Sequence, residues 1–140
     1  MILKNNNLKP DSNIKKLIVI AEDNPEARKA LESFLKPFYH VKAFENGEEA
    51  MTYINNNTAK VDLLVTDDGM PLMSGFEVLT LMKSDPNLAH IPVIMQTGSD
   101  DTEDCVWKKK LAAFLIKPVD CKTLLVSVKK AIQEADLPWF

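Results

Sequence analysis

The chain has 140 residues, the length of one domain, and its composition of 46% hydrophobic and 26% charged residues fits an ordinary globular protein. A net charge of −3 argues against non-specific electrostatic binding of nucleic acid, and no apolar run reaches the roughly 18 residues of a membrane span. The N-terminus lacks the apolar stretch of a signal peptide, and Cys105 and Cys121 form no ligand cluster. We therefore expect reduced thiols in a cytoplasmic protein that binds neither membrane nor nucleic acid directly.

Short apolar runs alternate with helix-like segments through most of the chain. The runs predict strands at 17–21, 39–44, 61–66, 92–97 and 113–116. The second of these includes His40 and Lys42, which is typical of an edge strand, whereas the others are almost continuously apolar. Residues 1–14 are polar and Asn-rich, so we expect a flexible leader there, and residues 137–140 form a short tail.

Helix start signals follow each predicted strand. Asn24, Asn46, Ser74 and Asp120 stand where N-caps are expected, and Pro37 and Pro86 mark helix ends. Between the fourth and fifth runs, an acidic stretch at 100–104 precedes a basic one at 108–110, which matches the dipole of a fourth helix. This strict alternation predicts an α/β fold of the doubly wound class, with a parallel sheet, right-handed crossovers and helices on both faces.

Polar side chains stand at the ends of four of the predicted strands. Glu22 and Asp23 follow the first, Asp67 the third and Lys117 the fifth, while Thr97 closes the fourth. The carboxyl ends of parallel strands gather at one sheet edge, which is where such sheets bind ligands. Three carboxylates placed together repel one another and suit Mg²⁺ with several waters kept. A lysine and a hydroxyl beside them are suited to receive a phosphoryl group.

These residues, in the segments VIAEDN, TDDGMPLMSGFEVL, VIMQTG and FLIKPVD, resemble the receiver domain of two-component response regulators. The best-known single-domain member of that family is the chemotaxis response regulator, and the resemblance runs from about residue 15 to residue 134. It implies a flavodoxin-like (βα)5 sandwich with strand order 2-1-3-4-5, and a receiver domain over residues 15–136.

The resemblance also implies a phosphoacceptor and a metal site. Asp67, three residues before Met70 in the Met-Pro pair, takes the place of the phosphoaccepting aspartate. Asp23 would bind Mg²⁺ directly, Glu22 would act through a metal-bound water, and the backbone carbonyl of Gly69 would supply a further ligand. An aspartate carboxylate can act as a nucleophile in covalent phosphoryl transfer, so the chemistry agrees with this assignment.

The resemblance further implies which residues would respond to phosphorylation and so act as the conformational switch. Lys117 would pair with the acyl phosphate, Thr97 would donate a hydrogen bond to it, and Phe114 would be the rotating aromatic residue. The chain departs from the usual pattern at Asp68, where an apolar residue is common, and at Leu111, where glycine is frequent. Phe114 itself lacks a tyrosine hydroxyl. These departures concern the switching surface more than the chemistry.

The expected function is a stand-alone receiver that accepts a phosphoryl group from a sensor histidine kinase or a histidine phosphotransfer protein. It would signal by protein contact through its fourth helix, fifth strand and fifth helix, to a downstream protein or to a second copy of the chain. It would not be an enzyme beyond its own phosphorylation and dephosphorylation. Two alternatives are a phosphorylation-independent scaffold and a Mg²⁺-dependent phosphohydrolase, although Gly69 stands where the second acid of the latter would be.

Overall fold

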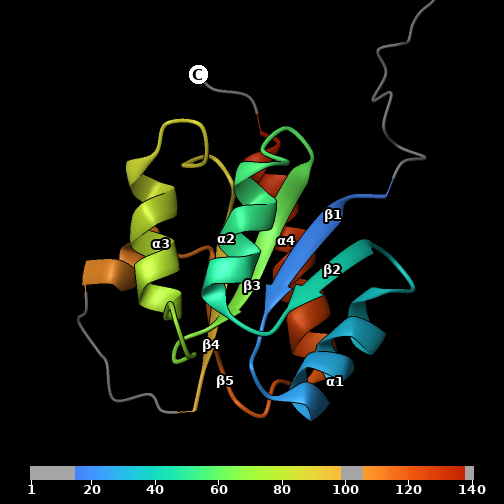
Figure 1. Cartoon of the computed structure of the whole chain (residues 1–140). Coiled ribbons are helices and arrows are strands. Elements are labelled where there is room, and N and C mark those ends of the chain that lie inside the picture. Colours follow the sequence, from blue (N-terminus) through green and yellow to red (C-terminus); the bar gives the residue numbers. More distant parts are fainter. Residues whose placement is uncertain (1–14, 99–105, 138–140) are drawn as a thin grey trace, which may run out of the picture.

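A computed structural model of the chain describes residues 15–98 and 106–137 (Figure 1). Its centre is a five-stranded sheet in the order β2-β1-β3-β4-β5, in which every neighbouring pair is parallel. The strands are β1 (Leu17–Ala21), β2 (His40–Phe44), β3 (Val61–Asp67), β4 (Val93–Thr97) and β5 (Ala113–Ile116). The predicted doubly wound fold and its strand order are confirmed.

The sheet separates two apolar cores, because successive side chains of a strand point to opposite faces. Ile18 and Ile20 of β1 pack in the core beneath one pair of helices, whereas Val19 and Ala21 pack beneath the other pair. In Figure 1 α2 and α3 lie in front of the sheet and α4 lies behind it. The helices are α1 (Pro25–Leu35), α2 (Gly47–Asn55), α3 (Gly75–Ser84) and α4 (Cys121–Ala135).

Each of the four predicted N-caps is made. The side chains of Asn24, Asn46 and Asp120 accept hydrogen bonds from backbone N–H groups in the first turns of α1, α2 and α4. Ser74 forms a capping box with Glu77 at the start of α3. These caps end the loops that follow β1, β2, β3 and β5, and so they fix where the loops at the carboxyl edge of the sheet stop.

The segment before β5 differs from the predicted fourth α-helix. Its acidic first half lies in 99–105, outside the described residues, and the second half forms a short 3₁₀ helix, η1 (Val106–Lys110). The N–H of Leu111 donates to the carbonyl of Lys108 over 3.2 Å, an i to i−3 bond that winds this turn more tightly than an α-helix. The predicted fifth helix is therefore α4 in Figure 1.

Other boundaries move by only one residue, and the predicted leader and most of the predicted tail lie outside the described residues. β2 and β4 begin one residue later than expected, and β3 extends by one residue to include Asp67. Within 15–98 and 106–137, no helix has both the length and the apolar character needed to cross a membrane.

Candidate functional site

The carboxyl ends of four strands bring the predicted site residues together at one edge of the sheet. Parallel register aligns Ala21 with Thr66, one residue before Asp67, and aligns Asp67 with Gln96. The backbone N–H of Lys117 donates to the carbonyl of Thr97 over 2.7 Å, which ties the end of β5 to the end of β4. Topology thus gathers residues that lie as much as 95 positions apart in the printed sequence, from 22 to 117.

Lys117 joins two buried carboxylates. Its Nζ lies 2.9 Å from Oδ1 of Asp67 and 3.2 Å from Oε1 of Glu22. The side chains of Glu22 and Asp67 are 0% and 6% exposed, whereas that of Lys117 is 30% exposed. One cation at the rim therefore compensates two anions beneath it, and burial strengthens these interactions relative to a surface ion pair.

Hydrogen bonds fix the carboxylate of Glu22 on both of its oxygens. Gln96 Nε2 donates to Oε1 over 2.9 Å, and the backbone N–H of Asn24 donates to Oε2 over 3.0 Å. Arg28 adds a 2.8 Å bond to the carbonyl of Glu22. Sequence reasoning missed Gln96, although a polar side chain within the apolar run VIMQT signals a buried partner, because buried polar groups are hydrogen-bonded.

Three carboxylates form a group that could hold a metal ion. Glu22, Asp23 and Asp67 each offer an oxygen, and these atoms all lie within 4.8 Å of one another. Asp23 is exposed and can reach a hydrated ion, whereas Glu22 already has partners on both oxygens and suits contact through a water. Gly69 is exposed, and no atom lies within 4 Å of where a side chain would begin. The donor set therefore fits Mg²⁺, which prefers oxygen ligands and retains waters.

The surroundings of Asp67 and Lys117 shift the pKa values of both side chains. The pKa of Asp67 is raised from 3.8 to about 6, because burial and, to a lesser extent, the negative charge of Glu22 raise it by more than the hydrogen bond from Lys117 lowers it. For Lys117 burial acts to lower the pKa, but its hydrogen bond with Asp67 and the charges of Asp67 and Glu22 outweigh burial and raise it. At neutral pH the Asp67 carboxylate is consequently ionised at a cost in free energy, which a cation would relieve.

Thr97 lies at the site, and in the unphosphorylated protein its hydroxyl bonds to an acid that the sequence reasoning gave no role. Its hydroxyl donates to Oδ2 of Asp68, the residue after the predicted acceptor. The backbone N–H of Asp68 lies 2.9 Å from Oδ1 of Asp67 and 3.1 Å from the carbonyl of Gln96. Asp68 is thus part of the site in this structure.

Close packing holds the loop between β3 and α3. A Cβ on Gly75 would lie 2.0 Å from the carbonyl oxygen of Asp67, so only glycine fits where α3 begins. The N–H of Gly75 also donates to the carbonyl of Asp68 over 2.9 Å. The start of α3 is therefore tied directly to the end of the strand that carries Asp67.

Phe114 lies at the side of the site. It is partly buried against the core between the sheet and helices α2 and α3, and Nζ of Lys108 lies 4.6 Å from its ring centroid. This cation–π contact joins η1 to β5. The side chain of Trp107, within η1, lies outside what the structure describes.

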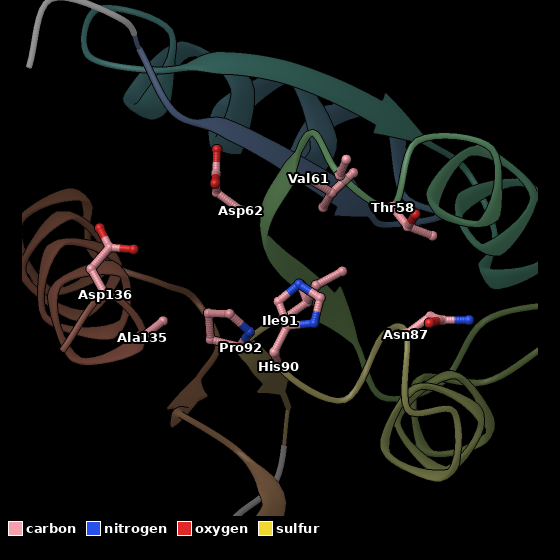
Figure 2. A pocket seen from close by; sticks show the side chains of 10 residues that line it. Thr58, Val61, Asp62, Asn87, His90, Ile91, Pro92, Ala135 and Asp136 are labelled. Carbon is pink, nitrogen blue, oxygen red and sulfur yellow. The ribbon is translucent and has the colours of Figure 1, made fainter. Parts of the chain in front are cut away.

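A separate hollow of about 280 Å³ lies at the opposite edge of the sheet, where the strands begin (Figure 2). Two acids line it, but both already have partners. Asp62 accepts a 2.8 Å bond from the N–H of Leu17, and Asp136 pairs with Lys16 at 3.3 Å. The chemistry therefore concentrates at the carboxyl edge.

Residues 18–129 match the response regulator receiver domain, and the chain belongs to that family. Protein PilH of Pseudomonas aeruginosa is 32% identical over 118 residues, which cover 82% of this chain and 96% of PilH. A receiver domain of a signal transduction histidine kinase from Syntrophus aciditrophicus has a TM-score of 0.78 at 28% identity, and covers 89% of this chain and 95% of that one.

Larger proteins also carry a similar segment. The 3',5'-cyclic-nucleotide phosphodiesterase regA of Dictyostelium discoideum is 42% identical over 83 residues, which are 59% of this chain but 10% of that protein. The chain spans 10%, 26% and 34% of the length of the first three curated relatives. The similarity therefore concerns the receiver domain, which is a signalling domain and not a conventional enzyme.

Proposed function

We propose that this receiver accepts a phosphoryl group on Asp67 from a histidine kinase or a histidine phosphotransfer protein, and signals through phosphorylation-dependent protein contact. The observation that carries the proposal is the buried Asp67 carboxylate, paired at 2.9 Å with Lys117 and placed beside Glu22 and Asp23. A carboxylate whose pKa is raised to about 6 is also a better nucleophile than an ordinary aspartate, because basicity and nucleophilicity rise together.

In the transfer, an oxygen of Asp67 attacks the phosphorus of a phosphohistidine. The new O–P bond forms as the P–N bond breaks, and the imidazole nitrogen retains the electron pair and takes up a proton from solvent. Lys117 stays within reach of the transferred oxygens and neutralises part of their charge. Glu22 holds Lys117 in this position through the 3.2 Å ion pair.

We propose Mg²⁺ as the cofactor, which would supply positive charge at the phosphoryl oxygens. Asp23 and Asp67 would bind it directly, Glu22 through a water, and Gly69 with its backbone carbonyl. The support for this arrangement is that Asp23 is exposed while both oxygens of Glu22 already accept hydrogen bonds.

Output would leave through the face formed by η1, β5 and α4, with Thr97 and Phe114 as the switch. Phe114 is partly buried and Lys108 covers its ring, so a rearrangement of Phe114 would move η1 as well. A downstream protein or a second copy of this chain would read that change. The receiver would be cytoplasmic and would act either as a diffusible regulator or as a phosphorelay intermediate.

The test is incubation with acetyl phosphate and Mg²⁺, followed by intact mass measurement. The wild type should gain one phosphoryl group, which is labile to acid and base. Asp67→Asn should gain none. Asp68→Asn makes the same chemical change at the neighbouring position, and it should still gain the group because Asp68 is not the proposed acceptor. Mass gain by Asp67→Asn would contradict the assignment of the acceptor, whereas no gain by the wild type would favour the phosphorylation-independent scaffold.

No specific observation favours the phosphohydrolase alternative. Such enzymes need a second acid two residues after the nucleophile, and Gly69 occupies that position.

A further inference from the structure

A second carboxylate stands directly beside the proposed phosphoacceptor, and it binds the switch hydroxyl. Thr97 is 5% exposed, and its hydroxyl donates to Oδ2 of Asp68. The proposed function does not account for this bond, because there the same hydroxyl serves the phosphoryl group on Asp67.

The two bonds exclude each other. A threonine hydroxyl has one O–H to donate, whereas an ionised carboxylate only accepts. The proton of Thr97 therefore cannot serve Asp68 and a phosphoryl oxygen on Asp67 at the same time. Bonds of a hydroxyl to a charged acceptor are among the stronger hydrogen bonds in proteins, so this competition has a measurable free energy.

In such a competition the side chain of Asp68 would move while its main chain stays in place. Its backbone N–H donates to Oδ1 of Asp67 and to the carbonyl of Gln96, and its carbonyl accepts from the N–H of Gly75. These bonds hold the main chain between β4 and α3. The side chain is partly exposed, so it has room to turn toward solvent.

Phosphorylation would also repel this carboxylate. A phosphoryl group brings roughly 1.5 to 2 negative charges, and like charges at neighbouring residues disfavour each other. Repulsion would drive Asp68 away at the moment when the phosphoryl oxygens become available to Thr97. Release of the hydroxyl by Asp68 and its capture by the phosphoryl group would then be a single exchange.

We propose that Asp68 is a positioning residue that holds the Thr97 hydroxyl in the unphosphorylated protein and competes with the phosphoryl group for it. The inference rests on the proposed phosphorylation of Asp67, and it adds an internal competitor to that site. The competitor stabilises the unphosphorylated arrangement, so it lowers the response to weak phosphorylation.

The test is titration with beryllofluoride, an analogue of the phosphoryl group, at saturating Mg²⁺, followed by backbone and methyl NMR. Asp68→Ala removes the competitor and should lower the dissociation constant for beryllofluoride about tenfold, as expected for loss of one charge-assisted bond. Asp68→Asn keeps an acceptor oxygen but removes the charge, so it should lie between the wild type and Asp68→Ala. Glu134→Gln, at an exposed position on α4, is the matched control for charge and should bind as the wild type does.

A double-mutant cycle with Thr97→Val separates competition from charge. In that background Asp68→Ala should raise the affinity for beryllofluoride only by the smaller factor that Asp68→Asn gives in the wild type. The reason is that no Thr97 hydroxyl remains for which Asp68 and the ligand compete. Without any ligand, the Thr97 methyl resonance should move in Asp68→Ala and not in Glu134→Gln.

Two outcomes are distinct. If the wild type binds beryllofluoride but Asp68→Ala binds no tighter, or gains as much in the Thr97→Val background, the competition is wrong and the receiver function stands. If the wild type does not bind beryllofluoride at all, both proposals fall.

Discussion

The buried Asp67 carboxylate should make the free protein less stable as pH rises. Its pKa is 3.8 in ordinary surroundings and about 6 in the folded protein, so the native state binds this proton more tightly than the unfolded chain. Stability from this group is then greatest below its unfolded pKa and falls as pH rises through the window from about 4 to 6. The shift of about two units corresponds to about 3 kcal/mol, because each unit is worth about 1.4 kcal/mol.

Asp67→Asn removes the charge while keeping the shape of the side chain. We expect this variant to unfold at higher urea than the wild type at pH 8, with a gain of up to about 3 kcal/mol, and to gain only about half as much at pH 5. Lys117 keeps its ion pair with Glu22 in the variant, so no cation loses all compensation.

Urea titrations of both proteins at pH 5 and pH 8, without divalent metal, measure the difference. Glu134→Gln, which neutralises an exposed acid on α4, should change stability little at either pH. Adding Mg²⁺ should stabilise the wild type more than Asp67→Asn. An equal difference at both pH values, or a wild type more stable than the variant at pH 8, would refute the reasoning.

Three further predictions follow from the site geometry. Asp23→Asn should weaken Mg²⁺ binding at least about tenfold in calorimetry, and unchanged affinity would remove Asp23 from the metal site. Lys117→Ala should still bind Mg²⁺ yet show much weaker NMR changes with beryllofluoride, because the lysine contacts the phosphoryl group and not the metal; wild-type changes would contradict this role. Gly75→Ala should cost at least about 2 kcal/mol in urea unfolding, since its Cβ would lie 2.0 Å from a carbonyl oxygen. Gly98→Ala, with nothing within 4 Å, should cost little, and equal losses would contradict the packing argument.

Features set by chain order and local composition were predictable from the sequence. The apolar runs fixed β1 and β3, and short polar side chains such as Asn24 and Ser74 marked the helix starts because they satisfy the first N–H groups. The convergence of Glu22, Asp67 and Lys117 followed from topology, since parallel strands end at the same edge.

Contacts that depend on side-chain placement across the fold were not predictable in the same way. Nothing local to Gln96 indicates that it donates to Glu22, and nothing local to Thr97 indicates that Asp68 accepts its proton. The tight turn of η1 depends on a bond between Leu111 and Lys108, which the charge pattern of that segment does not encode. These hydrogen-bond partners are determined by packing in the folded protein and by competition among neighbouring polar groups.

The charge cluster at the carboxyl edge also governs how molecules approach the protein. The cluster consists of four carboxylates and one ammonium, those of Glu22, Asp23, Asp67, Asp68 and Lys117. Its net charge of −3 equals the formal net charge of the whole chain, so the remaining charges cancel. Cations are steered toward this edge and anions are deflected from it, within roughly 8 Å of the surface at physiological salt. We therefore expect ordered encounters, in which a divalent cation arrives first and an anionic phosphodonor follows, with a donor on-rate that rises with ionic strength when the metal is absent.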